Sequence, residues 1–171
     1  MFRILVISLL LLSAPAQAVA QSEKLWNLCE GDDADAVISA CTRLLKSGKL
    51  DNYDRSVAYN NRGIAYRQKG DYDRAIADYD KAIKLNPKDP DAYNNRAWSY
   101  FKWGKAEQGL PDANKALELD AKDADSYDTR AHIYEVMGQK DKAISDYRKA
   151  LELDPSMEES KEGLKRLTAA P

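Results

Sequence analysis

A repeat of 34 residues runs through most of this chain and restricts the folds open to it. The segment SVAYNNRGIAYRQKGDYDRAIADYDKAIKLNP aligns without gaps with PDAYNNRAWSYFKWGKAEQGLPDANKALELDA and with ADSYDTRAHIYEVMGQKDKAISDYRKALELDP. Tyrosines recur in every copy, at Tyr59, Tyr93 and Tyr127 and again at Tyr66, Tyr100 and Tyr134. A fixed period of this length indicates supersecondary units that bury their apolar faces by stacking on one another.

Small residues at helical spacing predict what each unit looks like. In GDYDRAIADYDKAIKLNP, Ala75, Tyr79 and Ala82 share one face of a helix, and Ile76 and Ile83 widen that face. Small side chains on an apolar face allow a second helix to approach closely. The preceding helix keeps a small residue in each copy, at Gly63, Ala97 and Ala131, and a glycine marks each turn, at Gly70, Gly104 and Gly138. Each unit is therefore predicted to be an antiparallel helix pair.

Helix starts can also be predicted from capping residues. Asp89 precedes Pro90, a combination that favours an N-cap followed by proline at the first helical position. Asp123 is expected to cap the first helix of the third copy. After Pro155, Ser156 and Glu159 have capping-box spacing, which predicts a final helix reaching about Thr168.

The period, the tyrosines, the paired small residues and the closing prolines resemble the tetratricopeptide repeat family. This resemblance implies an all-α fold, a right-handed superhelix of stacked antiparallel helix pairs. The three units are residues 56–89, 90–123 and 124–155. Residues 21–55 are expected to form a divergent helical pair stacked before them, and residues 156–171 a C-terminal capping helix and tail.

The middle unit departs from this pattern in its second helix. It has Gly109, Ala113 and Ala121 where the neighbouring copies have alanine, tyrosine and proline. It also carries Pro111, which is unfavourable inside a helix unless it lies in the first turn. The sequence therefore predicts a late start of this helix, near Gln108.

A second departure recurs in all three units. Arginine stands where the family usually has leucine, at Arg62, Arg96 and Arg130, and aspartate follows sixteen residues later, at Asp78, Asp112 and Asp146. This recurrence predicts a structural ion pair between the two helices of each unit.

The first twenty residues have the pattern of a secretory signal peptide. Arg3 is followed by the apolar run Ile4 to Leu12, and small residues end the segment. The alternative is a membrane anchor, but this run would extend only about 14 Å as a helix, against roughly 30 Å of hydrocarbon. We expect cleavage after Ala18 or Ala20 and an exported, periplasmic or secreted, protein with no stable membrane insertion.

Cys29 and Cys41 are the two cysteines of the chain. Export would place them where disulfides persist, and closing this loop could stabilise the fold by roughly 3 kcal/mol. The alternative is a pair of buried free thiols, because cysteine packs as a small apolar residue. A metal site is not expected, since His132 is the single histidine and no second ligand cluster is present.

Composition and motifs argue against several classes of function. The net charge is −2 and no basic tract is present, so nucleic-acid binding is not expected. The sequence contains no nucleophile motif and no glycine-rich phosphate loop. We therefore expect neither enzymatic activity nor a cofactor.

The resemblance implies a partner-binding groove on the concave side, which the first helix of each unit lines. The inward positions are Asn60, Ile64, Arg67, Asn94, Trp98, Phe101, Asp128, His132 and Glu135. Trp98 and Phe101 would serve as aromatic anchors; the alternatives are packing between repeats for both, and an ordinary partly buried histidine at His132. The basic clamp with which chaperone-binding members hold a carboxylate is missing, because Asn60, Asp128 and His132 occupy its positions.

These observations predict a non-enzymatic adaptor that binds a protein or peptide segment in the groove. The alternative is a structural module that stacks into dimers or oligomers.

Overall fold

The computed structural model describes residues 14–169, and this part of the chain contains nine helices and no strand. The helices are α1 (Ala14–Cys29), α2 (Ala34–Lys46), α3 (Asn52–Gln68), α4 (Tyr72–Leu85), α5 (Pro90–Lys102), α6 (Ala106–Leu119), α7 (Ala124–Val136), α8 (Lys140–Leu153) and α9 (Glu158–Thr168). The expected all-α architecture is therefore confirmed.

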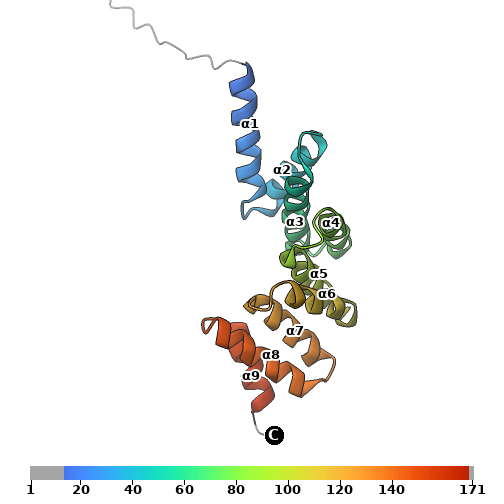
Figure 1. The fold of residues 1–171 in the computed structure, drawn as a ribbon, viewed down its shortest axis with the longest axis vertical. Helices are drawn as coiled ribbons and strands as arrows, with labels where there is room; N and C mark the ends of the chain where they lie inside the picture. Colours follow the sequence, from blue (N-terminus) through green and yellow to red (C-terminus); the bar gives the residue numbers. More distant parts are fainter. Residues whose placement is uncertain (1–13, 170–171) are drawn as a thin grey trace, which may run out of the picture.

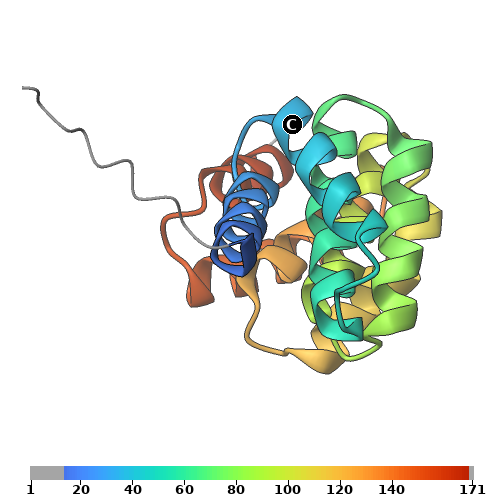
Figure 2. The same cartoon turned by 90° about the horizontal axis from the view of Figure 1, so that it is seen from above.

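The helices form a stack of pairs (Figure 1). The most extensive contacts are those of α3 with α4, α5 with α6 and α7 with α8, and each pair also packs on the next one. In addition, α3 contacts α5, α5 contacts α7, and α7 contacts α9. Seen along the stack, α4 and α6 lie on the side away from α1 and α9 (Figure 2). The first helices of successive units thus share one side of the molecule.

Small residues let the two helices of a unit approach closely, as expected. Ala75, Tyr79 and Ala82 of α4 are fully buried. A Cβ atom added at Gly63 of α3 would lie 2.7 Å from Cε1 of Tyr79, so the tyrosine ring fills the space that glycine leaves. The apolar face of α4 is consequently closed by its own unit.

The three predicted arginine–aspartate pairs are present. In each unit the guanidinium donates two hydrogen bonds to the aspartate sixteen residues later; for Arg62 and Asp78 the N···O distances are 2.6 and 2.9 Å. A third nitrogen reaches the preceding helix pair, where Arg62 donates to Oγ1 of Thr42 at 2.8 Å and Arg130 donates to Oδ1 of Asn114 at 3.0 Å. The same side chains therefore join the helices of a unit and neighbouring units.

Two helix starts are as predicted and a third is not. The carboxylates of Asp89 and Asp123 accept hydrogen bonds from the first-turn backbones of α5 and α7. The capping box at Ser156 is wrong, because Ser156 donates its N–H and its hydroxyl to Asp154. Helix α9 begins only at Glu158, after Met157, and has no side-chain cap.

The late start predicted for the second helix of the middle unit is also wrong. Helix α6 begins at Ala106, and Pro111 lies inside it. Pro111 lies on the exposed face of the helix, so its ring displaces no packed side chain of a neighbouring helix. The helix nonetheless lacks the hydrogen bond that an N–H at this position would donate to the carbonyl of Glu107.

The N-terminal segment forms a helix pair that packs on α3. Helix α1 begins at Ala14, so both predicted cleavage sites lie within it, whereas the apolar run of the predicted signal peptide lies outside the described residues. The sulfur atoms of Cys29 and Cys41 are 2.04 Å apart, at bonding distance. Helix α3 begins at Asn52, ahead of residue 56, at which the first unit was expected to begin.

Helix α9 packs as the first helix of a further, incomplete unit. Ser160 is buried, as are Ala58, Ala92 and Ser126, which precede it at intervals of 34 residues. A Cβ atom at Gly163 would collide with the ring of Tyr147, so glycine permits close docking. The final helix therefore extends the concave side by one element.

Candidate binding groove

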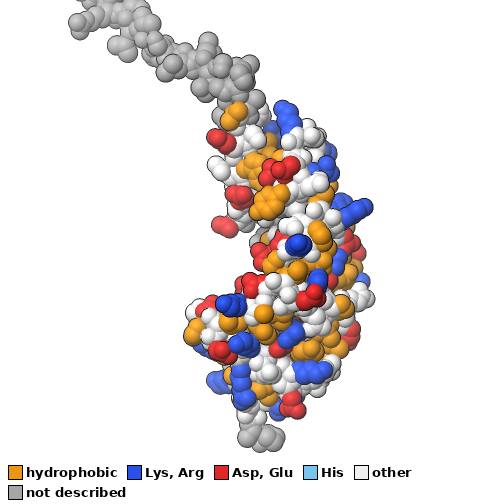
Figure 3. Space-filling model, viewed as in Figure 1, with side chains coloured by type: hydrophobic (Ala, Val, Ile, Leu, Met, Phe, Trp, Pro, Cys, Tyr) orange, Lys and Arg blue, Asp and Glu red, His pale blue; other side chains and the backbone are white. Residues whose placement is uncertain are grey.

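The concave side is formed by α3, α5, α7 and α9, and the stack is hollowed between α1 and α9 (Figure 3). Residues spaced by 34 lie on corresponding turns of these helices. Among the described residues, two pockets are lined by positions that the sequence places on this side.

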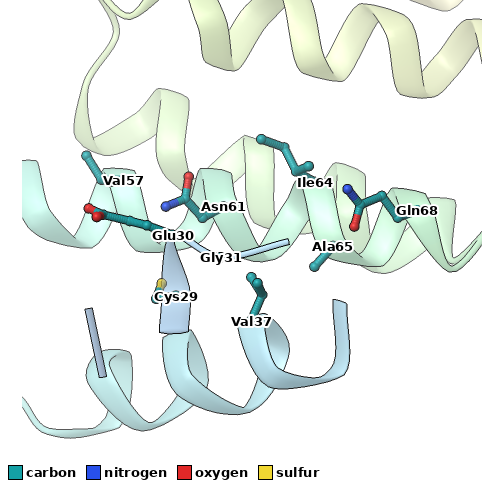
Figure 4. Close-up of a pocket in the computed structure, with 9 residues that line it drawn as sticks. All are labelled: Cys29, Glu30, Gly31, Val37, Val57, Asn61, Ile64, Ala65 and Gln68. Atoms are coloured by element: carbon teal, nitrogen blue, oxygen red, sulfur yellow. The ribbon is translucent and has the colours of Figure 1, made fainter. Parts of the chain in front are cut away.

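The first pocket lies where the loop between α1 and α2 meets α3 (Figure 4). Its volume is about 380 Å³. The lining is Cys29, Glu30, Gly31, Val37, Val57, Asn61, Ile64, Ala65 and Gln68. Ile64 is the single predicted site residue in this lining, and most of the wall is apolar. This end of the groove was not predictable from the repeats because half of it comes from the non-repeated N-terminal pair.

The second pocket lies further along the same side and has a volume of about 280 Å³. It is lined by Arg67, Asn94, Asn95, Trp98, Asp125, Asp128, Thr129, Met157 and Glu159. The structure thus brings together four predicted site residues, Arg67, Asn94, Trp98 and Asp128, from α3, α5 and α7. The acidic residues Asp125 and Glu159 were missed, although a recurrence at 34 residues links them to Asp91 and could have revealed them.

Polar atoms in the second pocket lack partners. Nε of Arg67 and Oδ1 of Asn94 are buried, and neither has a hydrogen-bond partner among the described residues. Leaving a buried polar atom unpaired costs roughly 1–3 kcal/mol. Asn60 differs, because its Oδ1 accepts a hydrogen bond of 3.2 Å from Asn95 and it lines neither pocket. Within the predicted polar row, Asn94 therefore lines the second pocket, whereas Asn60 is bonded to Asn95 and lines neither pocket.

Trp98 of the second pocket belongs to a cluster of aromatic rings. The ring of Trp98 stacks on Phe101 with a centroid distance of 4.9 Å, and His132 lies 5.4 Å from each of them. Tyr147 completes the cluster at 5.2 Å from His132. Phe101 also packs against the buried core between α5, α6 and α7. Trp98 lines the pocket, whereas Phe101 and His132 do not line it and instead contact the ring of Trp98.

Two predicted residues of the third unit, Asp128 and Glu135, contact helix α9 at the C-terminal end of the stack. Ser160 of α9 donates to Oδ1 of Asp128 at 2.5 Å. Arg166 of α9 and the hydroxyl of Tyr147 both donate to Glu135, and burial opposes but does not cancel their effect, so the pKa of Glu135 is lowered. Glu135 lines neither pocket and serves to dock α9.

His132 is bound to Asp128 in the same helix. Its Nδ1 lies 3.0 Å from the carbonyl oxygen and 3.3 Å from Oδ2 of Asp128. Burial lowers the pKa of His132, but the hydrogen bond and the negative charge of Asp128 outweigh it, so the pKa is raised above 6.5. The folded protein therefore binds a proton at His132 more readily than a free histidine side chain does.

Negative charge gathers where α5, α7 and α9 begin. Asp91, Asp125 and Glu159 occupy equivalent positions on these helices, and within the described part of the chain none forms an ion pair. Partial burial, followed by repulsion from nearby acids, raises the pKa of Asp91 and of Asp125. These carboxylates therefore lack compensating positive charge.

The described residues offer no metal site and no membrane span. No group of three or more histidine, cysteine, aspartate or glutamate side chains within residues 14–169 could hold a metal ion. No helix of this part is long and apolar enough to cross a membrane.

Profiles of known families match the repeated part. One described as TPR repeat matches residues 63–104, and two described as tetratricopeptide repeat match residues 90–123 and 125–157. The TPR domain of Arabidopsis OM64 is 30% identical, with a TM-score of 0.67, over 69% of this chain and 98% of that one. This chain belongs to the tetratricopeptide repeat family. No curated protein sequence matches it.

Two further structures show how widely this TPR fold is shared. The first TPR of Spaghetti (RPAP3), bound to the HSP90 peptide SRMEEVD, is 28% identical with a TM-score of 0.66, over 70% of this chain and 94% of that one. MamA from Desulfovibrio magneticus RS-1 is 23% identical with a TM-score of 0.71, over 88% of this chain and 81% of that one, and supports the fold alone. The first TPR of Spaghetti (RPAP3) is thus a similar domain that binds a peptide.

Proposed function

We propose that this TPR protein is a non-enzymatic adaptor that binds a peptide or protein segment along its concave side. The observation that carries the proposal is the second pocket, where Trp98 lies among polar side chains of α3, α5 and α7. A bound segment would form hydrogen bonds with the polar side chains of this lining, and its own side chains would cover the indole. Peptide binding by the related domain of RPAP3 supports the same reading.

The segment bound here differs from a carboxylate terminus held by a basic clamp. Asn60, Asp128 and His132 replace the clamp, and Asp128 is negatively charged when ionised. We further propose that the protein acts outside the cytoplasm, because the adjacent sulfur atoms of Cys29 and Cys41 and the signal-like N-terminus both fit an oxidising compartment.

The adaptor is favoured over the self-assembling module. The C-terminal end of the stack is covered by α9, whose outward side carries the exposed charged residues Glu158, Lys161, Glu162 and Lys165. A charged end surface disfavours end-to-end stacking through this helix. Light scattering over a concentration series should give a constant monomer mass, and a mass that grows with concentration would favour self-assembly.

The groove is tested by photo-crosslinking in cells. A photoreactive amino acid at Gln68, which lines the first pocket, should capture a defined partner, whereas one at Glu107 on α6 should not. In the same assay Trp98→Ala should weaken binding by roughly thirtyfold with the fold retained, as loss of an aromatic hot spot does. Equal capture from both positions would contradict the proposal, and so would unchanged binding by a stable Trp98→Ala variant.

A melting curve separates the two roles of Trp98. If this side chain only packs between repeats, its truncation should lower the free energy of unfolding by about 3–5 kcal/mol, as large aromatic truncations do. That result would remove Trp98 from the binding site.

A further inference from the structure

The lining of the second pocket contains charges of opposite sign. Arg67 lies near the C-terminal end of α3, whereas Asp125 and Glu159 lie in the first turns of α7 and α9. The first helices of the units run in the same direction, and the two positions differ by ten residues along the repeat. At 1.5 Å per residue, this places the backbone of Arg67 and the backbones of the two acidic residues at levels roughly 15 Å apart along the helices.

We infer that the acidic edge of the second pocket receives a lysine or arginine side chain of the bound segment, seated between Asp125 and Glu159 beside Trp98. This inference rests on the proposed function and specifies its partner as a segment with a basic residue. Asp125, Glu159 and Trp98 line the same pocket although they come from three different helices.

An acidic residue in a first helical turn has another role, which is to complement the helix dipole. Asp54, Asp73, Glu107 and Asp141 occupy first turns in other helices of this chain. None of these four lines the second pocket. Asp125 and Glu159 differ from them because they line that pocket together with Trp98.

The charges around the pocket favour a cation. Asp125 and Glu159 form no ion pair within residues 14–169, and Asp125 is further repelled by Asp123 and Asp128. Partial burial is the main cause of the raised pKa of Asp125, and repulsion from these acids adds to it. An ammonium or guanidinium group placed here would relieve the repulsion and gain charge-assisted hydrogen bonds. An acidic segment would instead add negative charge to an uncompensated cluster.

The probe for this inference is a phage-displayed library of short random peptides, selected on the full chain. We expect the selected peptides to be enriched in lysine and arginine. Replacing the basic residue of a selected peptide by glutamine should weaken its binding about tenfold or more, and raising the ionic strength should weaken it further. The double variant Asp125→Asn and Glu159→Gln should cause a similar loss, measured by fluorescence anisotropy.

The matched control is Glu107→Gln, which neutralises a first-turn carboxylate outside the pocket and should leave the affinity unchanged. Thermal unfolding of all variants verifies that they fold. Two results would overturn this inference and leave the groove function intact, provided that Trp98→Ala weakens binding of the selected peptides. One is that these peptides lack basic residues, and the other is that their affinity is the same for the Asp125→Asn and Glu159→Gln double variant. Binding that is indifferent to Trp98→Ala, or no selected peptide at all, would overturn both.

Discussion

At the scale of single residues, the arginine of each unit has more partners than its sequence position suggests. Arg130 donates to both carboxylate oxygens of Asp146, at 2.7 and 3.0 Å, and lies over the rings of Tyr127 and Tyr134. The exposed fractions of the two charged side chains are 21% and 9%. The pair is therefore intermediate between a surface ion pair and a buried one.

Removing the acid should leave this arginine partly buried without compensation. We expect Asp146→Ala to lower the free energy of unfolding by about 2 kcal/mol, between the values of exposed and buried pairs. Glu152→Ala is the control, because Glu152 is exposed and forms its ion pair within residues 14–169 with Lys149 on the same helix. Urea unfolding compares the two variants. Equal free energies of unfolding would mean that the pair in the third unit stabilises the fold no more than an exposed ion pair does.

The single histidine predicts how stability depends on pH. Because the folded pKa of His132 lies above its usual 6.5, the folded state binds the proton more tightly than the unfolded chain does. The stabilisation is complete below the unfolded pKa and is lost as the pH rises through the folded pKa. The melting temperature should therefore rise when the pH is lowered from about 8 to about 6.

The variant His132→Gln should remove this slope, because no other side chain has an ordinary pKa in that range. Below about pH 5 the trend should reverse, since the lowered pKa of Glu135 makes its protonation destabilising. A wild-type melting temperature that is flat between these pH values, or a slope that persists in the variant, would show that the contact with Asp128 does not bias protonation.

At the scale of helices, Pro111 identifies the least regular element. Its ring lies on the exposed face of α6 and removes one backbone hydrogen bond. We expect Pro111→Ala to stabilise the protein by about 1–2 kcal/mol, because restored helix propensity outweighs the added freedom of the unfolded chain. Urea unfolding measures this, with the exposed Gln108→Ala of the same helix as the control. A neutral or destabilising effect would indicate that the proline fits the helix without strain.

The sequence revealed where the middle unit departs from its neighbours but not how the structure compensates. Ala113 replaces the tyrosine that fills the other units, and the fully buried Ile133 of the next unit packs in its cluster. Gly109 permits close packing of α5 on α6, since a Cβ there would lie 2.7 Å from the carbonyl oxygen of Ala97. These adjustments involve two units at once, so a comparison of single copies could not predict them.

At the scale of the whole molecule, repetition determined what could be predicted. Each unit contacts mainly its neighbours, so the period and the small residues were sufficient for the helix pairs and their order. Of the predicted inward positions in the middle unit, Asn94 and Trp98 line a pocket. Toward the ends the repeat gave no guide to the surroundings of the groove, because Glu135 docks α9 and the loop at Gly31 lines the first pocket. Neither feature repeats.

Cys29 of α1 and Cys41 of α2 connect the two non-repeated helices at the N-terminal end. Both side chains are buried, and Cys29 also lines the first pocket, so the pair fixes one end of the groove. A bond across a separation of 12 residues restricts the unfolded chain and should stabilise the protein by roughly 3 kcal/mol. Cys29→Ser combined with Cys41→Ser should therefore lower the melting temperature.

Thiol labelling after denaturation without reductant measures the bond directly. We expect no labelled cysteine in protein purified from an oxidising compartment and two per chain after reduction. Reductant should lower the melting temperature of the wild type but not of the double serine variant, which separates loss of the bond from loss of packing. Two free thiols before reduction would show that the cysteines are packed side by side without a bond, and the N-terminal pair would then depend on the apolar cluster that contains Val37 and Leu44.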